Sequence, residues 1–135
     1  MGQAYSRQAK SLTPYSTLRE AVELTLSSFQ SDFPVCEESR VVGLLTHSQL
    51  VEALSRGGPE QTVASSMRTN ISPLSPGDSL VLAQNRLSEE RLDALPVEEA
   101  GRFVGLVTSR DIGEVFQLAS RWPGLSERAT RAIPS

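Results

Sequence analysis

The sequence predicts a mixed α/β (α+β) fold made of two related β-α-β-β-α units packed about a pseudo-twofold axis. Three observations lead to this prediction. The chain repeats itself at one constant offset, and each copy changes from helical to strand periodicity in the same order. An apolar content of 39% in 135 residues is also enough to form a core.

The repeat consists of short apolar stretches in register. Pro34-Val35 recurs as Pro96-Val97, and Val42-Gly43-Leu44 recurs as Val104-Gly105-Leu106. The offset that carries Pro34 onto Pro96, called the repeat offset below, also aligns residues 12–54 with residues 74–116 without a gap. Because chance does not readily produce such an alignment, we interpret the chain as an internal duplication.

In the first copy, Thr17-Leu-Arg-Glu20 has the spacing of a capping box and predicts the start of an amphipathic helix. Its predicted apolar face contains Leu18, Ala21, Val22, Thr25, Leu26 and Phe29. The runs at 33–36 and 40–45 predict a β-hairpin around the polar turn 37–39. A second helix is predicted from Ser48 to about Ser55, where Gly57-Gly58-Pro59 ends it. No first strand is visible before Leu12.

The second copy repeats this order less clearly. We predict a short first strand near Ile71 and then a helix over 79–87, strands over 94–97 and 102–107 around a turn at 98–101, and a helix over 110–118. The predicted organisation is an N-terminal segment 1–11, repeat 1 at 12–58, a linker 59–69, repeat 2 at 70–119 and a polar tail 120–135, in which Trp122 is the strongest packing residue.

Composition excludes several classes of function. A net charge of −3 without a Lys/Arg block argues against nucleic-acid binding. No apolar run approaches the roughly 18 residues that span a bilayer, so we expect a cytoplasmic protein without direct membrane insertion. Cys36, the single cysteine, fits a small buried hydrophobe better than a reactive thiol.

The stretches "TLREAV…FPV…VVGLLT" and "SPGDSL…LPV…FVGLVTSRD" resemble the CBS domain, and two copies in tandem resemble a CBS pair, or Bateman module, over residues 12–118. This resemblance implies a regulatory module that binds an adenine nucleotide and forms a homodimer. The stretches "QSDFPV" and "GLVTSRDIGEVFQL" look like the CBS pairs of site-2-protease-like membrane zinc metalloproteases. His47 is the only histidine and no His-Glu-x-x-His is present, so the protease itself would occupy another segment of the parent chain. The CBS pair would then be tethered to a membrane protein.

Thr108 and Asp111 stand where a strand ends and a helix begins. A hydroxyl and the free N–H groups of a helix start suit a phosphate, and a carboxylate suits the adjacent hydroxyls of a ribose. The resemblance accordingly assigns Thr108 to phosphate and Asp111 to ribose, with Ser109 beside them and Arg110 as the nearest cation.

The resemblance also places the adenine between Asn70-Ile71-Ser72 and Ala94-Leu95-Pro96, with Ile71 or Leu95 against its face. Repeat 1 keeps Thr46 but has Gln49 at the position of Asp111. A neutral hydrogen bond contributes roughly 1 kcal/mol against about 1.5–3 kcal/mol for a charged one, so this second cleft should bind more weakly.

Simpler interpretations stay open for each residue. Asp111 can act only on the helix dipole, Thr108 and Thr46 can be N-caps, and Arg110 can be a solvated surface cation. His47 is more typical of an exposed side chain without a ligand. Gly43 and Gly105 are best explained by close backbone packing within a strand.

Two functions remain at this stage. The first is a sensor that binds AMP, ADP or ATP and needs no other cofactor. It would control an effector on the same parent chain or an associated effector protein. An S-adenosyl compound or NADH is an alternative ligand. The second is a ligand-free scaffold that dimerises through its helices, with Leu18, Val22, Leu50, Leu54, Leu80 and Val115 as candidates. One histidine supports neither a catalytic triad nor a metal site, so we expect no catalytic residues and no metal.

Overall fold

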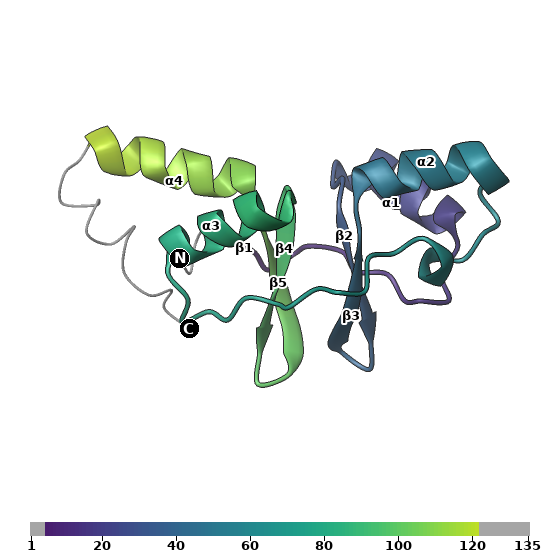
Figure 1. Ribbon diagram of the computed structural model, residues 1–135, viewed down its shortest axis with the longest axis horizontal. Helices are drawn as coiled ribbons and strands as arrows, with labels where there is room; N and C mark the ends of the chain where they lie inside the picture. The colour runs from purple at the N-terminus through teal and green to yellow at the C-terminus, as the bar shows by residue number, and fades with distance from the viewer. Residues whose placement is uncertain (1–4, 122–135) are drawn as a thin grey trace. The chain divides into compact units, whose positions relative to one another are not determined.

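The computed structural model describes residues 5–121, with side chains as far as Leu118. Most of the predicted tail, including Trp122, lies outside the described residues. The elements are β1 (Tyr5–Ser6), α1 (Leu18–Ser28), β2 (Phe33–Glu37), β3 (Arg40–Leu45), α2 (His47–Gly57), the short 3₁₀ helix η1 (Val63–Ser65), α3 (Leu80–Glu90), β4 (Ala94–Glu99), β5 (Arg102–Thr108) and α4 (Ser109–Arg121) (Figure 1). The predicted α/β fold class is confirmed.

The chain divides into two compact units. The α1/α2 unit contains residues 8–72 with 101–103, and the α3/α4 unit contains the residues up to 7, 73–100 and those from 104 onwards. In each unit two helices lie next to a β-hairpin (Figure 1). The two hairpins and the second helix of each copy begin within one residue of the predicted positions.

Helix starts follow the predicted capping pattern. The Thr17 side chain accepts a hydrogen bond from the Glu20 N–H at 3.3 Å, and the Ser79 side chain accepts one from the Leu82 N–H at 3.0 Å. The two contacts are related by the repeat offset, and both satisfy N–H groups that a helix start leaves without intrahelical partners. The duplication therefore extends from the sequence to individual backbone contacts.

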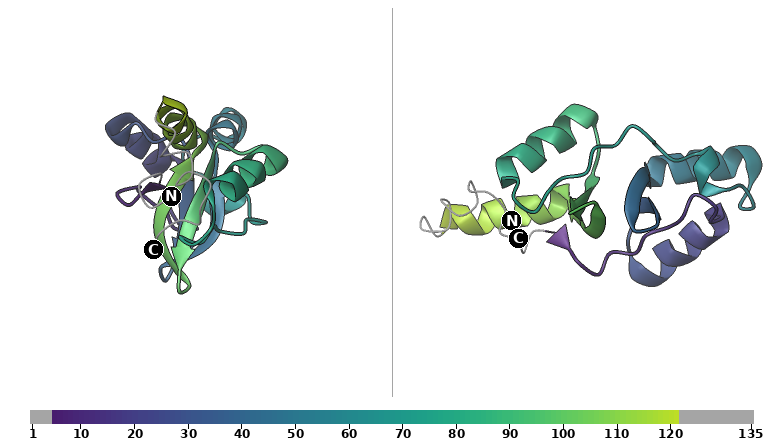
Figure 2. Two further views of the ribbon diagram at one scale, coloured as in Figure 1. Left: turned by 90° about the vertical axis from the view of Figure 1, so that its left-hand side faces the viewer. Right: turned by 90° about the horizontal axis from the view of Figure 1, so that it is seen from below.

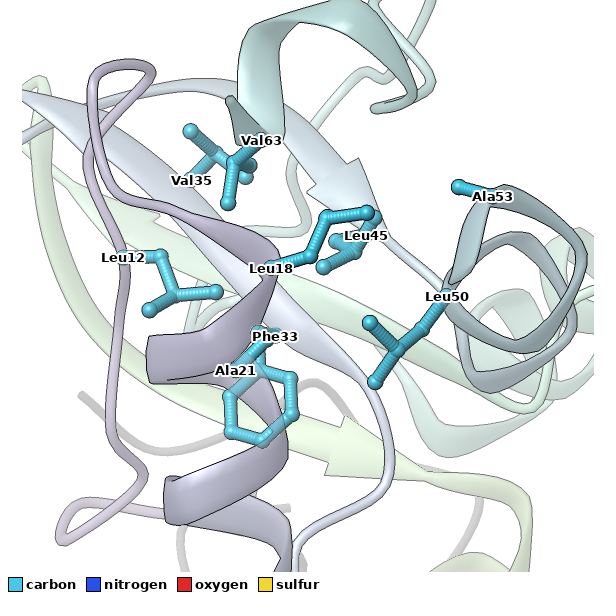
Figure 3. Close-up of a cluster of buried hydrophobic side chains, with 9 residues drawn as sticks. All are labelled: Leu12, Leu18, Ala21, Phe33, Val35, Leu45, Leu50, Ala53 and Val63. Carbon is cyan, nitrogen blue, oxygen red and sulfur yellow. The ribbon is translucent and has the colours of Figure 1, made fainter. Parts of the chain in front are cut away.

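The core of the α1/α2 unit is formed by side chains from both helices, the hairpin and η1 (Figure 3). Its members are Leu12, Leu18, Ala21, Phe33, Val35, Leu45, Leu50, Ala53 and Val63. All of these except Ala53 and Val63 have equally buried counterparts at the repeat offset in the α3/α4 unit. The counterparts are Leu74, Leu80, Ala83, Leu95, Val97, Val107 and Ile112. The predicted apolar positions thus form two similar cores.

Two residues of the predicted apolar face of α1 are not buried. Leu26 is 76% exposed, and Phe29 is 93% exposed just after α1 ends. Phe29 has a φ of 61°, so the backbone has left the helix and the residue no longer follows the helical period. The prediction was correct for Leu18 and Ala21 and wrong for Leu26 and Phe29.

The first strand of each copy pairs with the hairpin of the other copy. Tyr5 and Ser6 in β1 pair antiparallel with Val107 and Leu106 in β5 (Figure 2, right, short purple arrow). In the α1/α2 unit, Arg68 forms the equivalent bridge to Leu44, with N–O distances of 2.8 and 2.9 Å. A strand therefore does precede Leu12. The first-strand pairing of repeat 2 occurs at Arg68, slightly before the position predicted near Ile71.

Glycines allow these exchanged segments to approach. A Cβ added at Gly105 would lie 2.6 Å from the Ser6 carbonyl oxygen and 2.5 Å from the Tyr5 ring. A Cβ at Gly43 would lie 2.9 Å from the Arg68 carbonyl oxygen. Both contacts are shorter than a real Cβ makes, so only glycine fits. The predicted role of both glycines in close backbone packing is confirmed.

We expect Gly105→Ala to destabilise the protein by about 1–3 kcal/mol, because the added methyl must displace β1. Gly113→Ala is the matched control. It lies within α4, where an added Cβ meets no atom within 4 Å, and should stabilise the protein by about 0.5–1 kcal/mol. Chemical denaturation of the three proteins measures both effects. Equal stability of Gly105→Ala and the wild type would contradict the pairing of β1 with β5.

Candidate functional site

The start of α4 brings four predicted site residues together in one helical turn, namely Thr108, Ser109, Arg110 and Asp111. Thr108 ends β5, and its Oγ1 accepts a hydrogen bond from the Asp111 N–H at 3.1 Å. The Ser109 N–H donates to the Asp93 carbonyl oxygen at 2.9 Å. This bond fixes the first turn of α4 against the residue that precedes β4.

Asp111 keeps its carboxylate available. The side chain is partly exposed, and it makes no hydrogen bond or ion pair with residues 5–118; only its backbone N–H is bonded. Thr108 caps the helix through that N–H, as one of the simpler interpretations proposed. Capping therefore leaves both carboxylate oxygens of Asp111 free to accept hydrogen bonds from a ligand.

Arg110 has the features of a solvated surface cation. Its side chain is 88% exposed and pairs with Glu114 one turn further along α4, at 3.4 Å. An exposed pair of this kind contributes little to stability and can exchange partners at low cost. Arg110 could turn to a bound phosphate, but the structure does not hold it there in advance.

The residues predicted to surround an adenine are divided between the two units. Leu95 and Pro96 are buried within the α3/α4 unit, and the Pro96 carbonyl accepts a hydrogen bond from the Leu74 N–H at 2.9 Å. Asn70, Ile71 and Ser72 belong to the α1/α2 unit, outside any helix or strand. Of this set, only Ile71 combines partial exposure with an apolar side chain.

A surface pocket of about 430 Å³ lies between the end of α3 and the start of α4. Ser88, Arg91, Ser109 and Gly113 line its sides, and the buried Ile112 contributes to its floor. Thr108 and Asp111 do not line it, so the pocket is separate from that pair. Sequence reasoning missed this pocket, although a glycine in the middle of a predicted helix was a signal for it.

The start of α2 has the same backbone but a different set of side chains. Thr46 and Gln49 form a reciprocal capping box, in which the Gln49 side chain accepts from the Thr46 N–H at 3.1 Å. The His47 N–H donates to Oδ1 of Asp32 at 2.9 Å. Asp32 was missed because it stands well before α2 in the sequence, on the other side of the hairpin β2–β3.

Within residues 5–121, no three His, Cys, Asp or Glu side chains are grouped so that they could hold a metal ion. None of the helices there is long and apolar enough to cross a membrane.

Similar proteins agree on one fold. A CBS-domain-containing protein of Agrobacterium tumefaciens shares 22% identity and a TM-score of 0.73 over 81% of this chain and 90% of that one. A protein from Methanocaldococcus jannaschii, described as a proposed archaeal homolog of γ-AMPK, shares 20% identity and a TM-score of 0.75 over 84% of this chain and 46% of that one. A CBS domain pair solved in complex with 5′-methylthioadenosine and S-adenosyl-L-methionine shares 22% identity and a TM-score of 0.76 over 84% of this chain and 95% of that one.

A sequence relative comes from Thermofilum pendens and is described as an uncharacterized 33.4 kDa protein in a ribosomal RNA operon. It is 31% identical over 98 residues, which are 72% of this chain and 33% of that protein. This chain thus spans about a third of the length of that relative.

The sequence model of the CBS domain matches twice, at residues 2–56 and 63–117. The exchanged strands, the duplicated core and these two matches together place the chain in the CBS domain family, as a tandem pair.

Proposed function

We propose that this CBS pair is a regulatory module that binds an adenine nucleotide, AMP, ADP or ATP, at the start of α4. One observation carries the proposal. The Asp111 carboxylate stands in the first turn of α4 without a partner among residues 5–118, whereas the side chain of its counterpart Gln49 is used in a capping box.

The chemistry of the α4 start suits the two polar parts of a nucleotide. The positive end of the helix and the N–H of Arg110 attract a phosphate, and the Thr108 hydroxyl can donate a hydrogen bond to it. The Asp111 carboxylate accepts hydrogen bonds from both ribose hydroxyls. Ile71 remains our candidate for contact with the base, and Arg110 for additional phosphate charge.

Binding acts by shifting a conformational equilibrium and needs no reaction. A ligand that binds one arrangement of the protein better than another stabilises that arrangement by the difference in affinity. The effector would be an associated protein or another part of the parent chain. The resemblance of "QSDFPV" to the CBS pairs of membrane proteases makes such a protease one candidate. The adenosine compounds in a similar CBS pair support the ligand class.

Calorimetric titration with AMP, ADP, ATP and S-adenosylmethionine tests the site. We expect about one nucleotide per chain, with Asp111→Ala weakening it by about tenfold to a hundredfold because a charge-assisted hydrogen bond is lost. Gln49→Ala, the matched change in repeat 1, should leave the affinity unchanged.

Three results would count against this site. Equal affinity of wild type and Asp111→Ala would move the ligand elsewhere, and saturable binding of S-adenosylmethionine alone would replace the nucleotide as ligand. Absence of binding by all four compounds at millimolar concentration would favour a scaffold that works without ligand.

A second function, dimerisation, is favoured by complementary surfaces at equivalent positions of the two repeats. Leu26, Phe29 and Val51 are exposed apolar side chains around the end of α1 and the start of α2. The repeat offset leads from them to Ser88, Arg91 and Gly113, which line the pocket of the α3/α4 unit. Repeat 1 therefore has exposed apolar side chains at the positions where repeat 2 has a pocket. In a two-fold dimer in which repeat 1 of each protomer faces repeat 2 of the other, each protomer would insert Phe29 into the pocket of its partner. The same contact is then made twice.

The residues suggested earlier for this interface divide between core and surface. Leu18, Leu50 and Leu80 are buried inside their own units, with exposed fractions of 0%, 4% and 1%, so they cannot form an interface. Val22 and Leu54 are partly buried against the core of the α1/α2 unit. Exposed apolar residues are thus better candidates than the buried ones.

We expect Phe29→Asp to convert a dimer into a monomer, because a carboxylate cannot enter an apolar contact without losing its hydration. Gly113→Leu should have the same effect by filling the pocket. Tyr15→Asp changes another exposed aromatic residue, 75% accessible in the same unit, and should leave the dimer intact. Sedimentation velocity measures all three. A wild-type monomer, or a dimer that survives both changes, would contradict this interface.

A further inference from the structure

The two helix starts differ in what occupies an equivalent N–H group. In repeat 1 the His47 N–H donates to the carboxylate of Asp32, and in repeat 2 the Ser109 N–H donates to the backbone carbonyl of Asp93. His47 and Ser109 correspond under the repeat offset, but the residue that corresponds to Asp32 is Ala94. Repeat 1 therefore has a negative charge at its helix start that repeat 2 lacks at the same place.

Neighbouring bonds hold Asp32 in this position. The Gln30 side chain donates to the backbone carbonyls of Asp32, at 2.9 Å, and of Lys10, at 2.8 Å, and it accepts from the Lys10 N–H at 2.8 Å. These three bonds fix the segment that leads into β2. The carboxylate is thus placed before any ligand arrives and does not need to be ordered by one.

The Asp32 carboxylate accepts an N–H of the helix start and so competes with another anion for that donor, whereas the Asp111 side chain occupies no N–H of α4. The positive end of a helix attracts one negative group strongly, and Asp32 already supplies it to α2. A phosphate at the same turn would stand close to a like charge and would lose the His47 N–H as a donor. Gln49 adds a neutral amide that is itself bonded within the capping box.

We propose that Asp32 excludes phosphate-bearing ligands from repeat 1 and thereby limits the pair to one nucleotide per chain. The inference rests on the proposed function, because it concerns the same kind of ligand. This proposal differs from the simpler view that repeat 1 binds a nucleotide weakly only because position 49 is not an acid. Repeat 1 does have an acid at the start of its second helix. This acid, Asp32, belongs to the segment before β2, and its carboxylate occupies the His47 N–H that a phosphate would need.

Titration with AMP in an Asp111→Ala background, in which the repeat 2 site is weakened by about tenfold to a hundredfold, isolates this effect. Gln49→Asp supplies the missing ribose acceptor but keeps Asp32. In that protein we expect only the residual, weakened binding of repeat 2. Once Asp32→Asn is added, we expect about one AMP per chain in repeat 1, with an affinity about tenfold or more above that residual binding. Asn keeps an oxygen acceptor for the His47 N–H, so the fold should persist. Asp32→Ser is a second variant with the same property, and thermal melting verifies folding.

Asp78→Asn is the matched control, because Asp78 also accepts a backbone N–H, that of Ser75, at 2.8 Å. Combined with Gln49→Asp in the same background, it should not raise the affinity for AMP. Equal AMP affinity with and without Asp32→Asn would overturn the inference.

The two proposals fail separately. If the wild type binds AMP but the Asp32→Asn, Gln49→Asp protein in the Asp111→Ala background does not, the inference is wrong and the proposed function stands. If the wild type binds nothing and that variant binds AMP, the inference stands and the proposed site in repeat 2 is wrong. Absence of binding by both overturns both.

Discussion

Backbone contact between an exchanged strand and a strand glycine is the constraint on which each unit depends. β1 passes over Gly105, and the segment around Arg68 passes over Gly43, at distances where a side chain on the glycine would collide with the neighbouring carbonyl. Each hairpin obtains a third partner from the other copy, because a two-stranded hairpin alone is marginal in water. The two copies therefore cannot be separated at the boundary that the repeat suggests.

The hairpins that these segments complete also position the two helix starts of the proposed site. β3 and β5 lead directly into α2 and α4, so Thr46 and Thr108 necessarily stand where a strand becomes a helix. What differs between the copies is the source of the negative charge at that point. Asp111 lies on the helix and has unused acceptors, whereas Asp32 lies before the strand and uses its carboxylate on the backbone. Equivalent backbones thus carry an acid on the helix itself in repeat 2 and on the segment before β2 in repeat 1.

Sequence patterns predicted most of this fold because the relevant signals are local. Capping residues, alternation in the hairpins and helical spacing of apolar residues each act within a few positions, and the elements appeared at or near the predicted places. The errors occurred where the backbone leaves its local pattern. Phe29 continues the helical period in the sequence but has a left-handed backbone, and the first strands have no partner within their own copy.

The sequence by itself determined the duplication, the two cores and the Thr-x-x-Asp turn, since each is written in the spacing of apolar and polar residues. Only the tertiary structure decided which strand pairs with which hairpin, that a pocket lies between the end of α3 and the start of α4, and that Asp32 bonds to α2. Those features join residues distant in the chain, such as Ser6 with Leu106 and Asp32 with His47. Their pairing depends on how the whole chain packs, because a hydrogen bond across a fold has no periodic trace in the sequence.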